Sequence, residues 1–596
     1  MIILGISWTI CSTAALFVNN RLVACASEER FSRVKNDDAF PSQAITYCLR
    51  EGAISAGELD AVVVCNYQAP YEGLILGQAA WSIEDYLDEQ HRVWYPRFYE
   101  NESVSRIEAM KNKLKLDAYP ADYWKQSRED PEAPRKFNED RKDIIAAFLG
   151  IDRDRVHLTE HHKSHAYYSY FASPFIGEKA LSFTVDGIGD GFNATAGIFH
   201  GDGRYERIYA TNECNIGRIY RYMTLLLGMK PNEHEYKVMG LAPYGKEKYA
   251  RKALDLFGGT LFVDGTEFRW KNRPRDSYFW FKERLEGIRF DSIAYALQSW
   301  VEDLLTKWIS NTIRAYGIHK VVISGGVSMN IKAVGNIARL KDVEDLFVAG
   351  CGSDESLAIG SIFLHLFEST GYTMDGGFTP VSDLYLGPAV SRDDVARLLS
   401  SIDMTKYEVI EDPSAGHIVD RLIGGKVIAR CLDRMEFGQR ALCNRSILAD
   451  PINLRTKETI NAMVKNRDFW MPFAPVLLDS CTGKYLRNPN GVLSPHMTVG
   501  YETTPAGYEA MLAACHPADR SARPQILERR TNPKMYDLLL EFEARTGRGA
   551  LLNTSFNLHG HPIVNTAGDA FDVFTNSGLD GLYFENALIM KKDSGA

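Results

Sequence analysis

The chain is 596 residues long, which at roughly 100–200 residues per domain predicts several domains. Apolar residues make up 45% of it and charged residues 24%, which excludes disorder, collagen and coiled coil as the main architecture. Its 68 basic and 77 acidic residues give a net charge of −9. This mild acidity makes a duplex nucleic acid held mainly through its phosphates a poor candidate for the main partner.

The sequence predicts a cytoplasmic protein without a membrane anchor. No stretch reaches about 18 uninterrupted apolar residues, so no spanning helix is expected. The apolar N-terminus lacks the basic residues that open a signal peptide. The ten cysteines are dispersed without a C-x-x-C pair, which predicts buried thiols in a reducing compartment and no zinc ribbon.

The first 65 residues predict the opening of an α/β domain. In chain order, the apolar patterns give strands at 2–6 and 13–27, with Asn19-Asn20 as a hairpin turn within the latter. A helix that follows Pro41 and ends at Gly52 and a strand at 61–65 come next. Residues 66–150 then interleave aromatic and charged residues without a clean period. They predict an insertion with helical pieces, which is either a lid or substrate wall or a plain surface elaboration.

Strands and helices alternate again after the insertion. The patterns give a strand and glycine turn at 180–191, a hairpin at 195–211, an amphipathic helix at 291–316, strands at 320–326 and 345–351, and a helix at 355–369. This alternation predicts a substantially parallel sheet covered by helices. A Gly, Pro and Asp-rich stretch near 370–385 is typical of a domain joint, and the chain beyond it is again α/β.

The first chemical motif is HHKSH at 161–165. On a helix, His161 and His165 share one face, so both imidazoles can point at one metal ion, and carboxylates would complete a mixed nitrogen–oxygen site. Asp186 and Asp354 follow apolar strands, where a carboxylate would lie at the carboxyl edge of a sheet. The alternative is a polar helix start that is rich in histidine by chance.

The second motif is SGGVSMN at 324–330, directly after an apolar strand. Its glycines let backbone amides approach a phosphate, and the N-terminus of a following helix would add a favourable dipole. A tight strand-to-helix turn explains the same residues equally well.

The third motif is a cluster of arginines around a glycine turn, formed by Arg434, Arg440 and Arg445. Arginine forks fit phosphate and carboxylate oxygens, so the cluster predicts a phosphorylated small molecule or nucleotide, with surface charge as the alternative. Further donors follow along the chain: Lys465, Arg467, Arg523, and Asn553, Thr554, Ser555 and Asn557 of the LLNTSFN run.

Taken together, these residues resemble the NodU/CmcH family of O-carbamoyltransferases. The similarity runs in order through ILGIS, SEERFSRVKNDDAFP, HHKSH, VDGIGDG, EYKVMGLAPYG, SGGVSMN, CGSDESLAIG, RMEFGQRALCNRSILADP, KNRDFWMPFAP, RPQ and LLNTSFNLHGHPIV. It covers nearly the whole chain apart from the insertion at 66–150. So many ordered motifs are far more specific than any one of them.

The resemblance implies two catalytic α/β domains. Residues 1–375, with the insertion at 66–150, would be an actin-like ATPase-type domain similar to the tRNA threonylcarbamoyl transferase subunit, and residues 385–596 would be a YrdC-like domain. The second domain would make carbamoyl adenylate from carbamoyl phosphate and Mg-ATP. The first domain, with Fe(2+) or a similar divalent metal, would transfer the carbamoyl group to a hydroxyl of a small natural product or sugar, as in antibiotic biosynthesis.

The family's site residues carry over by motif. The metal ligands would be His161, His165, Asp186 and Asp354. Gly325, Gly326 and Asn330 would hold nucleotide in the first domain, while Arg440, Lys465, Arg523, Asn553 and Ser555 would contact carbamoyl phosphate and the adenylate in the second. The resemblance thus assigns catalytic roles to His161, His165, Arg440, Lys465, Arg523 and Ser555. The expected partner is a hydroxylated small molecule, with no nucleic acid and no membrane, and a homodimer is left open.

Two positions depart from the family pattern. Many members carry His-Asp-Ser in the first glycine-rich turn, where this chain has Ile10, Cys11 and Ser12. Isoleucine is inert and an ordinary thiol is mostly protonated at neutral pH, so we expect the acceptor to be deprotonated through the metal or a metal-bound carboxylate. The alternative is a turn that only contacts nucleotide. Cys443, where the family usually has glycine, is the smaller departure.

Two other classes of function compete with this one. A fused enzyme of tRNA threonylcarbamoylation is disfavoured by the mild acidity and by the RMEFGQRALCNRS block, which is similar to the O-carbamoyltransferase version of the domain. A non-catalytic nucleotide-binding or sugar-kinase-like protein is disfavoured because all four expected metal ligands and the cationic set of the second domain are retained.

Overall fold

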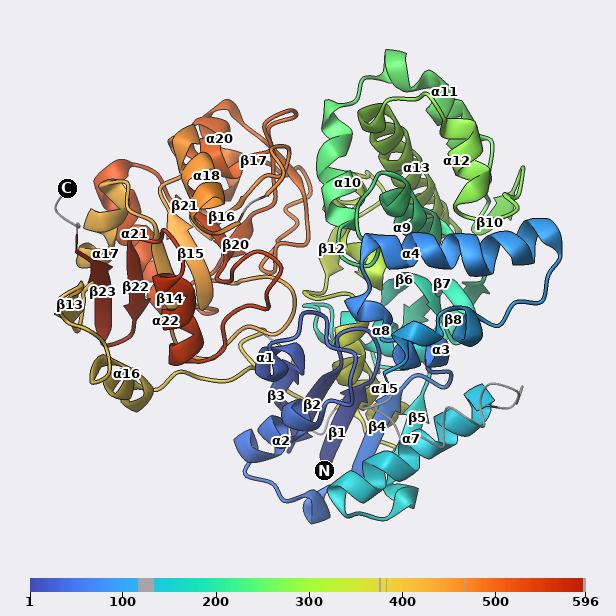
Figure 1. The fold of residues 1–596 in the computed structure, drawn as a ribbon, viewed down its shortest axis with the longest axis horizontal. Helices are drawn as coiled ribbons and strands as arrows, with labels where there is room; N and C mark the ends of the chain where they lie inside the picture. The colour runs from blue at the N-terminus through green and yellow to red at the C-terminus, as the bar shows by residue number, and fades with distance from the viewer. Residues whose placement is uncertain (116–132, 375–376, 382, 466, 593–596) are drawn as a thin grey trace. The chain divides into compact units, whose positions relative to one another are not determined.

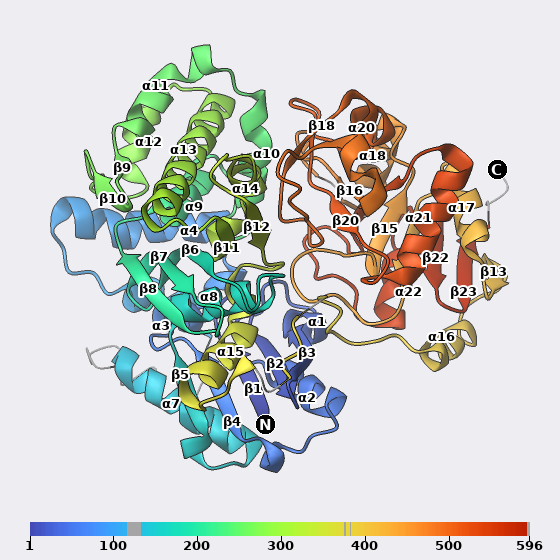
Figure 2. The same ribbon diagram turned by 180° about the vertical axis from the view of Figure 1, so that it is seen from behind.

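The computed structural model describes residues 1–115, 133–374, 377–381, 383–465 and 467–592. The chain divides into two units, Met1–Val381 and Ser382–Ala596, each with its own sheets and helices (Figures 1 and 2). The expected α/β class is confirmed in both units.

The first unit contains two five-stranded sheets of one topology. The first sheet has the order β3-β2-β1-β4-β5, from Ile2–Ser7 (β1), Thr13–Val18 (β2), Arg21–Ser27 (β3), Ala61–Cys65 (β4) and Val156–Thr159 (β5). The second has the order β8-β7-β6-β11-β12, from Ala180–Gly189 (β6), Phe192–Phe199 (β7), Tyr205–Thr211 (β8), Lys320–Ser324 (β11) and Asp345–Val348 (β12). This duplicated arrangement is that of the actin-like ATPase fold.

Each sheet is half antiparallel. The hairpins expected within 13–27 and at 195–211 are confirmed as β2–β3 and β7–β8. The parallel pairing predicted after the insertion is confirmed for β6, β11 and β12 and is wrong for β6 with β7. Strands β1–β3 and β6–β8 pair antiparallel, whereas β4 and β5, and β11 and β12, are added in parallel. The expected hairpin turn at Asn19-Asn20 explains the antiparallel pairing of β2 with β3. Asn19 and Asn20 both have positive φ, and a two-residue turn of this kind joins only antiparallel strands.

Two helices are exchanged between the sheets. Helix α8 (His161–Phe171) follows the first sheet but packs on β6 and β11, whereas α15 (Leu357–Ser369) follows the second sheet but packs on β1 and β4. The two helices also pack on one another. A Cβ atom at Gly360 would lie 2.0 Å from the carbonyl oxygen of Ser164, so this approach requires glycine. The HHKSH motif is thereby brought between the sheets.

Further helices cover the remaining faces of the first unit. On the first sheet, α2 (Ser42–Glu51) packs on β2 and β3 and α7 (Ala133–Leu149) on β5, while α9 (Ile216–Leu226) packs on β6. The long helix α13 (Phe290–Tyr316) places Trp308 edge-on against Phe183 of β6. The amphipathic helix expected at 291–316 is therefore confirmed.

The described residues of 66–150 form helical pieces, as expected. Those before residue 116 include α3 (Tyr71–Ile75), α4 (Ile83–Glu89), π-helical turns at Gln90–Trp94 and Pro96–Glu100, and α5 (Arg106–Ala109). Their aromatic side chains supply a small core of their own, in which Trp81 and Tyr86 are buried with Leu225 and Tyr278. Part of the aromatic content of this segment is therefore local packing.

The second unit is built on one mixed sheet of eight strands. Its order is β13-β23-β22-β14-β15-β21-β16-β20. The strands are Tyr407–Glu411 (β13), Ile428–Cys431 (β14), Arg445–Ala449 (β15), Ala474–Leu478 (β16), Gln525–Leu527 (β20), Ala550–Ser555 (β21), Gly581–Phe584 (β22) and Ala587–Lys591 (β23). The helices that pack on it are α17 (Ala415–Ile423), α21 (Pro533–Thr546) and α22 (Ala567–Thr575).

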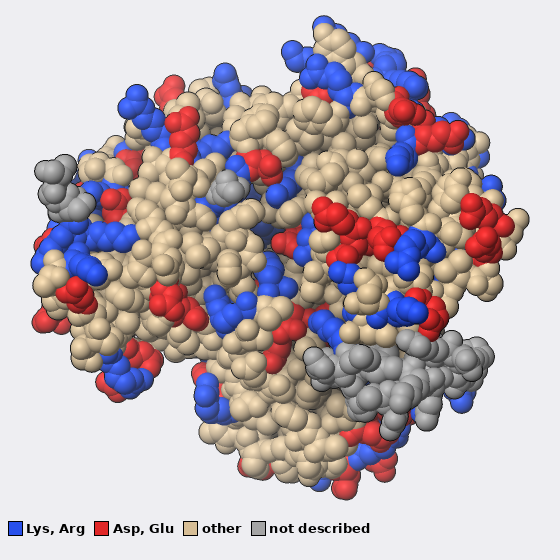
Figure 3. Space-filling model, viewed as in Figure 1, with Lys and Arg blue, Asp and Glu red and all other residues tan. Residues whose placement is uncertain are grey.

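Surface and burial agree with the composition. All ten cysteines are buried, as expected for dispersed single thiols. In the described part of the chain, no helix has both the length and the apolarity to cross a bilayer. Charged side chains of both signs are interspersed over the face drawn in Figure 3, in keeping with the near balance of basic and acidic residues.

Candidate functional site

The HHKSH motif opens helix α8. His161 is the first helical residue, and Glu160 caps the helix by accepting hydrogen bonds from the amides of His162 and Lys163. His165 lies one turn further on the same face. The helix predicted from the spacing of the two histidines is therefore confirmed.

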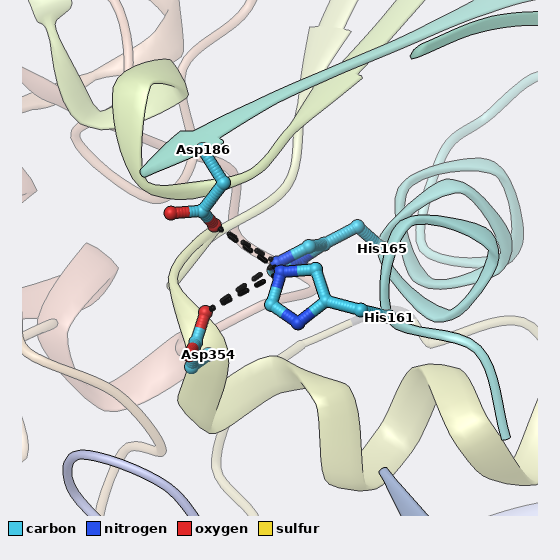
Figure 4. Close-up of side chains that lie close together, drawn as sticks. All are labelled: His161, His165, Asp186 and Asp354. Carbon is cyan, nitrogen blue, oxygen red and sulfur yellow. Dashed lines mark ion pairs between the residues drawn. The ribbon is translucent and has the colours of Figure 1, made fainter. Parts of the chain in front are cut away.

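Both histidines face two carboxylates, as Figure 4 shows. Asp186 lies towards the carboxyl end of β6, and Asp354 begins the short helical turn that precedes α15. One ligand atom from each of the four residues lies within 4.8 Å of the others. The structure thus brings together the four residues predicted to bind metal, from positions as far apart in sequence as 161 and 354.

The distances and burial of this cluster fit a metal ion. His165 Nε2 lies 3.2 Å from Asp186 Oδ2 and 3.6 Å from Asp354 Oδ1, and His161 Nε2 lies 3.7 and 3.9 Å from the same atoms. The histidines are 1% and 0% exposed, and neither Nε2 atom has a hydrogen-bond partner among the described residues. Buried polar atoms in proteins are rarely left without a hydrogen-bond partner. Two imidazoles and two carboxylates form the donor set of a divalent transition metal.

The carboxylates favour positive charge on the imidazole of His161. Burial lowers the pKa of His161, but Asp354 and Asp186 outweigh it and raise that pKa to about 9. Burial raises the pKa of Asp186, but the neighbouring His161 and His165 bring it well below its usual value. The cluster therefore stabilises a cation between its side chains, whether protons or a metal ion supply the charge.

Asp186 also joins this cluster to the glycine turn of SGGVSMN. The amide of Gly326 donates to Asp186 Oδ2 at 3.0 Å, and the amide of Gly187 donates to Oδ1 at 2.6 Å. Gly325 has φ +91°, and a Cβ there would lie 2.3 Å from the carbonyl oxygen of Val185. Only glycine fits this position. Through the amide of Gly326, the turn predicted to approach a phosphate lies directly beside the histidine–carboxylate cluster.

Asn330 has a structural role that the sequence analysis missed. Its Oδ1 accepts the amide of Ala333 at 3.1 Å and so caps α14 (Ile331–Ala338), the helix after the glycine turn. Its Nδ2 donates to Gln298 Oε1 at 3.0 Å. Asn330 therefore holds the turn in place, and its contact with nucleotide stays a prediction.

Two further residues that support the histidines were also missed. Ser324 Oγ lies 3.3 Å from His165 Nδ1, the position in which a metal-bound histidine usually has a hydrogen-bond partner. Asp190 accepts the amides of His161, Tyr67 and Gln68 at 2.8, 3.1 and 2.7 Å. Both lie within motifs already singled out, at the ends of β11 and β6, and this position was the available signal.

The strand that leads to the turn at Ile10 and Cys11 contacts the backbone of the cluster. Ser7, at the end of β1, donates from Oγ to the carbonyl oxygen of Asp354 at 2.7 Å. Cys11 is 5% exposed, and burial together with Glu29 and Glu355 raises the pKa of its thiol well above the usual range. Cys11 is therefore protonated at neutral pH and is not poised to act as a base.

Three of the predicted residues of the second unit lie near the end of β21. Lys465 is 2% exposed, and its Nζ donates to Ser555 Oγ at 3.0 Å and to Asn557 Oδ1 at 2.6 Å. Asn553 shares the face of β21 with Ser555, two residues away. Its Oδ1 is buried and has no hydrogen-bond partner in the part of the chain that the structure describes. Lys465, Asn553 and Ser555 are thus brought together.

The arginine cluster is divided between two roles. Arg434 donates to the carbonyl oxygens of Leu386 and Gly387, and Arg445 is fully buried with its donors on four backbone carbonyls, including Leu432 at 2.6 Å. These two arginines hold the framework of the unit, so the prediction of a common anion-binding role is wrong for them. Arg440 is half-buried, as is Arg523.

Comparison with known proteins decides the family. The family model described as Carbamoyltransferase N-terminus matches residues 2–363, and the one described as Carbamoyltransferase C-terminus matches residues 419–591. The chain belongs to the carbamoyltransferase family. The resemblance read from the motifs is thereby confirmed.

Three relatives show which proteins the chain is similar to. An uncharacterized protein of Methanocaldococcus jannaschii is 30% identical over 74% of this chain and 75% of its own. Nodulation protein NolNO of Sinorhizobium fredii is 27% identical over 97% of this chain and 78% of its own. The 3'-hydroxymethylcephem-O-carbamoyltransferase of Amycolatopsis lactamdurans is 32% identical over 41% of this chain and 44% of its own.

The insertion contacts the residues just before the EYKVMGLAPYG motif, whose first residue, Glu235, begins α10 (Glu235–Leu241). Asn232 Nδ2 donates to the hydroxyl of Tyr86 in the insertion at 3.3 Å, and its amide donates to Glu235 Oε1 at 2.7 Å. Burial raises the pKa of Glu235 to about 7, although amide hydrogen bonds and Arg221 oppose it. A carboxyl group that titrates near neutrality therefore lies where the insertion meets the motif.

We predict that Glu235→Gln stabilises the protein at alkaline but not at acidic pH. The folded pKa lies above the unfolded one, so the contribution of Glu235 is fully present below its unfolded pKa and is lost as the pH rises through about 7. This loss is at most about 3 kcal/mol, because one pKa unit corresponds to about 1.4 kcal/mol and the side chain is partly exposed. Urea unfolding at about pH 5 and about pH 8 measures it. Glu247→Gln, at an exposed helical position, is the control. An equal gain at both pH values would contradict the prediction.

Proposed function

We propose that the protein is an ATP-dependent O-carbamoyltransferase that acts on a hydroxyl of a small natural product or sugar. The observation that carries the proposal is the convergence of His161, His165, Asp186 and Asp354 in a chain that belongs to the carbamoyltransferase family. The relative from Amycolatopsis lactamdurans, whose name states O-carbamoyl transfer, supports the choice of a hydroxyl acceptor.

In this proposal the second unit makes carbamoyl adenylate. Hydrolysis of carbamoyl phosphate gives carbamate and phosphate, and a carbamate oxygen then attacks the α-phosphorus of ATP as pyrophosphate leaves. Lys465, Arg440 and Arg523 supply positive charge for the phosphoryl oxygens as charge shifts between them. Lys465 suits this role because Ser555 and Asn557 hold its ammonium group from neutral oxygens in a buried position.

The first unit then transfers the carbamoyl group. The acceptor oxygen attacks the carbamoyl carbon, the hydroxyl proton leaves and AMP departs. His161, His165, Asp186 and Asp354 would hold Fe(2+) or a similar divalent ion, which when bound supplies Lewis-acid polarisation of the carbonyl or hydroxyl. The proton would pass to Asp186 or Asp354 as a metal-bound carboxylate, because the Cys11 thiol is buried and protonated. Gly325 and Gly326 would place the adenylate phosphate beside Asp186.

The first prediction from the proposed function separates carbamoyl adenylate formation from carbamoyl transfer. His165→Ala should lose the metal and acceptor carbamoylation but keep carbamoyl adenylate formation. Removal of a ligand should weaken metal binding by more than the ~10–100-fold that loss of a ligand's hydrogen-bond partner costs. Metal analysis of the purified protein and ATP–pyrophosphate exchange dependent on carbamoyl phosphate measure the two outcomes. His200→Ala, at a histidine paired with Glu206 outside the cluster, is the control. Full metal occupancy in His165→Ala would contradict the assignment of His165 as a metal ligand.

The second prediction concerns the cationic residues of the second unit. Arg440→Ala or Arg523→Ala should lower the exchange reaction by ~100-fold or more, because an arginine at a phosphate contributes several kcal/mol. The first unit should stay folded and loaded with metal. Arg392→Ala, at an exposed position paired with Asp412, should leave exchange unchanged. Normal exchange rates in both active-site variants would assign the second unit another role.

The third prediction tests the turn that lacks the family's histidine. Cys11→Ala should transfer the carbamoyl group at a near-normal rate, because the buried thiol is protonated at neutral pH. The acceptor for this assay comes from a mass-spectrometric screen of hydroxylated compounds for a carbamoyl mass increment. A loss of ~100-fold or more, the scale of general-base removal, with metal and adenylate formation intact, would show that Cys11 is catalytic.

A further inference from the structure

The turn Ala441–Asn444, which leads from Arg440 into β15, has an unusual backbone. Cys443 within it has φ +85°, a conformation that favours glycine. Its side chain is fully buried, and its Sγ donates to Gln525 Oε1 at 3.1 Å. A residue with a Cβ persists in this region only where the surrounding structure holds it there. Some neighbour must therefore hold the turn.

Arg430 of β14 holds the carbonyl side of this turn. Its Nη1 donates to the carbonyl oxygen of Cys443 and, at 2.8 Å, to Asn444 Oδ1. Glu436 accepts the amides of Leu442 and Asn444, so the amide and carbonyl groups of the turn have separate partners. Arg430 is fully buried, and its Nε and Nη2 have no hydrogen-bond partner among the described residues. Among the described residues, this buried guanidinium hydrogen-bonds to the turn alone, so holding the turn is the role that its contacts indicate.

The register of the sheet places Arg430 on the face of the proposed adenylate site. Arg430 pairs with Ser446 of β15, and Ser446 pairs with Ser555 of β21, in the neighbouring strands of Figure 1. Residues directly paired across strands project to the same face of a sheet. Arg430, Ser446 and Ser555 therefore form one row, and Lys465 contacts the last of them.

The turn also contacts Asn553. Asn553 Nδ2 donates to the carbonyl oxygen of Ala441 at 3.1 Å and lies 3.6 Å from Cys443 Sγ. These contacts turn Asn553 Oδ1, which has no hydrogen-bond partner among the described residues, away from the turn. A buried amide oxygen of this kind accepts an N–H, the group that a carbamoyl substrate presents.

We propose that Arg430 is a positioning residue for carbamoyl adenylate formation. By holding the carbonyl of Cys443, it fixes the turn 441–444 in the conformation that sets Asn553 and the adjoining Arg440 at the site. The inference rests on the proposed function and deepens it. It also explains how a residue other than glycine stands at 443, because the arginine supplies the restraint that glycine would not need.

A double-mutant cycle tests the proposal, with Arg430→Met, Cys443→Gly and the double variant. Arg430→Met removes both hydrogen bonds from Nη1 to the turn and removes the buried charge with them. It should lower the Tm and raise the KM for carbamoyl phosphate in ATP–pyrophosphate exchange by ~10-fold, with kcat changed less. Cys443→Gly should resemble wild type. In the double variant the KM should stay within about threefold of Cys443→Gly, because glycine adopts the turn unaided.

Two controls separate positioning from stability. Arg548→Gln breaks the contact with Asp450 in the same unit and should lower the Tm without raising the KM. Arg430→Lys, which keeps one donor for the carbonyl of Cys443, should recover most of the KM and replaces Arg430→Met in the cycle if that variant does not fold.

The outcomes are distinct. Additive effects of the two substitutions on both Tm and KM would overturn the proposal, since residues that act through one contact are not additive. Absence of carbamoyl-phosphate-dependent exchange in the wild type would instead remove the proposed function. The Tm cycle would then decide alone whether Arg430 holds the turn.

Discussion

Helices α8 and α15 approach closely because Gly360 faces the backbone of Ser164 without a side chain between them. Each helix follows one sheet and packs on the other, so their contact ties the two halves of the first unit together. The same contact brings the start of α8 and the segment before α15 to one point. Histidines from one half and Asp354 from the other can then face a common centre, with Asp186 contributed by the second sheet. A bulkier residue at 360 would separate the ligands as well as the sheets.

Short-range patterns predicted much of this arrangement. The i, i+4 spacing of His161 and His165 indicated a helix with both imidazoles on one face, and the positions of Asp186 and Asp354 after apolar strands indicated the edge of a sheet. The convergence of the four depends on the exchange of α8 and α15, which no local pattern reveals. The duplication of the sheets was equally hidden, because the connection between the third and fourth strands is far longer in the second copy than in the first.

The arginines show where residue type fails as a guide. Arg434, Arg440 and Arg445 lie within one motif, yet Arg434 and Arg445 donate to backbone carbonyls of their own unit. A guanidinium fork fits a carbonyl-lined turn as well as it fits a phosphate, and every turn carries carbonyls. Only the three-dimensional structure distinguishes an arginine that binds backbone carbonyls from one available to a phosphate. Cys443 is the converse case, because its departure from the family's glycine was visible in the sequence, whereas its partner Arg430 became apparent only through the register of β14 and β15.

Asp190 has a consequence for how such enzymes diversify. Its carboxylate binds the amide of His161 and also the amides of Tyr67 and Gln68, at the start of the insertion. The root of the insertion is thus anchored to the helix that carries the histidines. All three contacts are made to backbone amides, so the side chains at 67 and 68 can vary while the path of the chain stays fixed. The start of the insertion can therefore change in sequence without losing its alignment with the ligand helix.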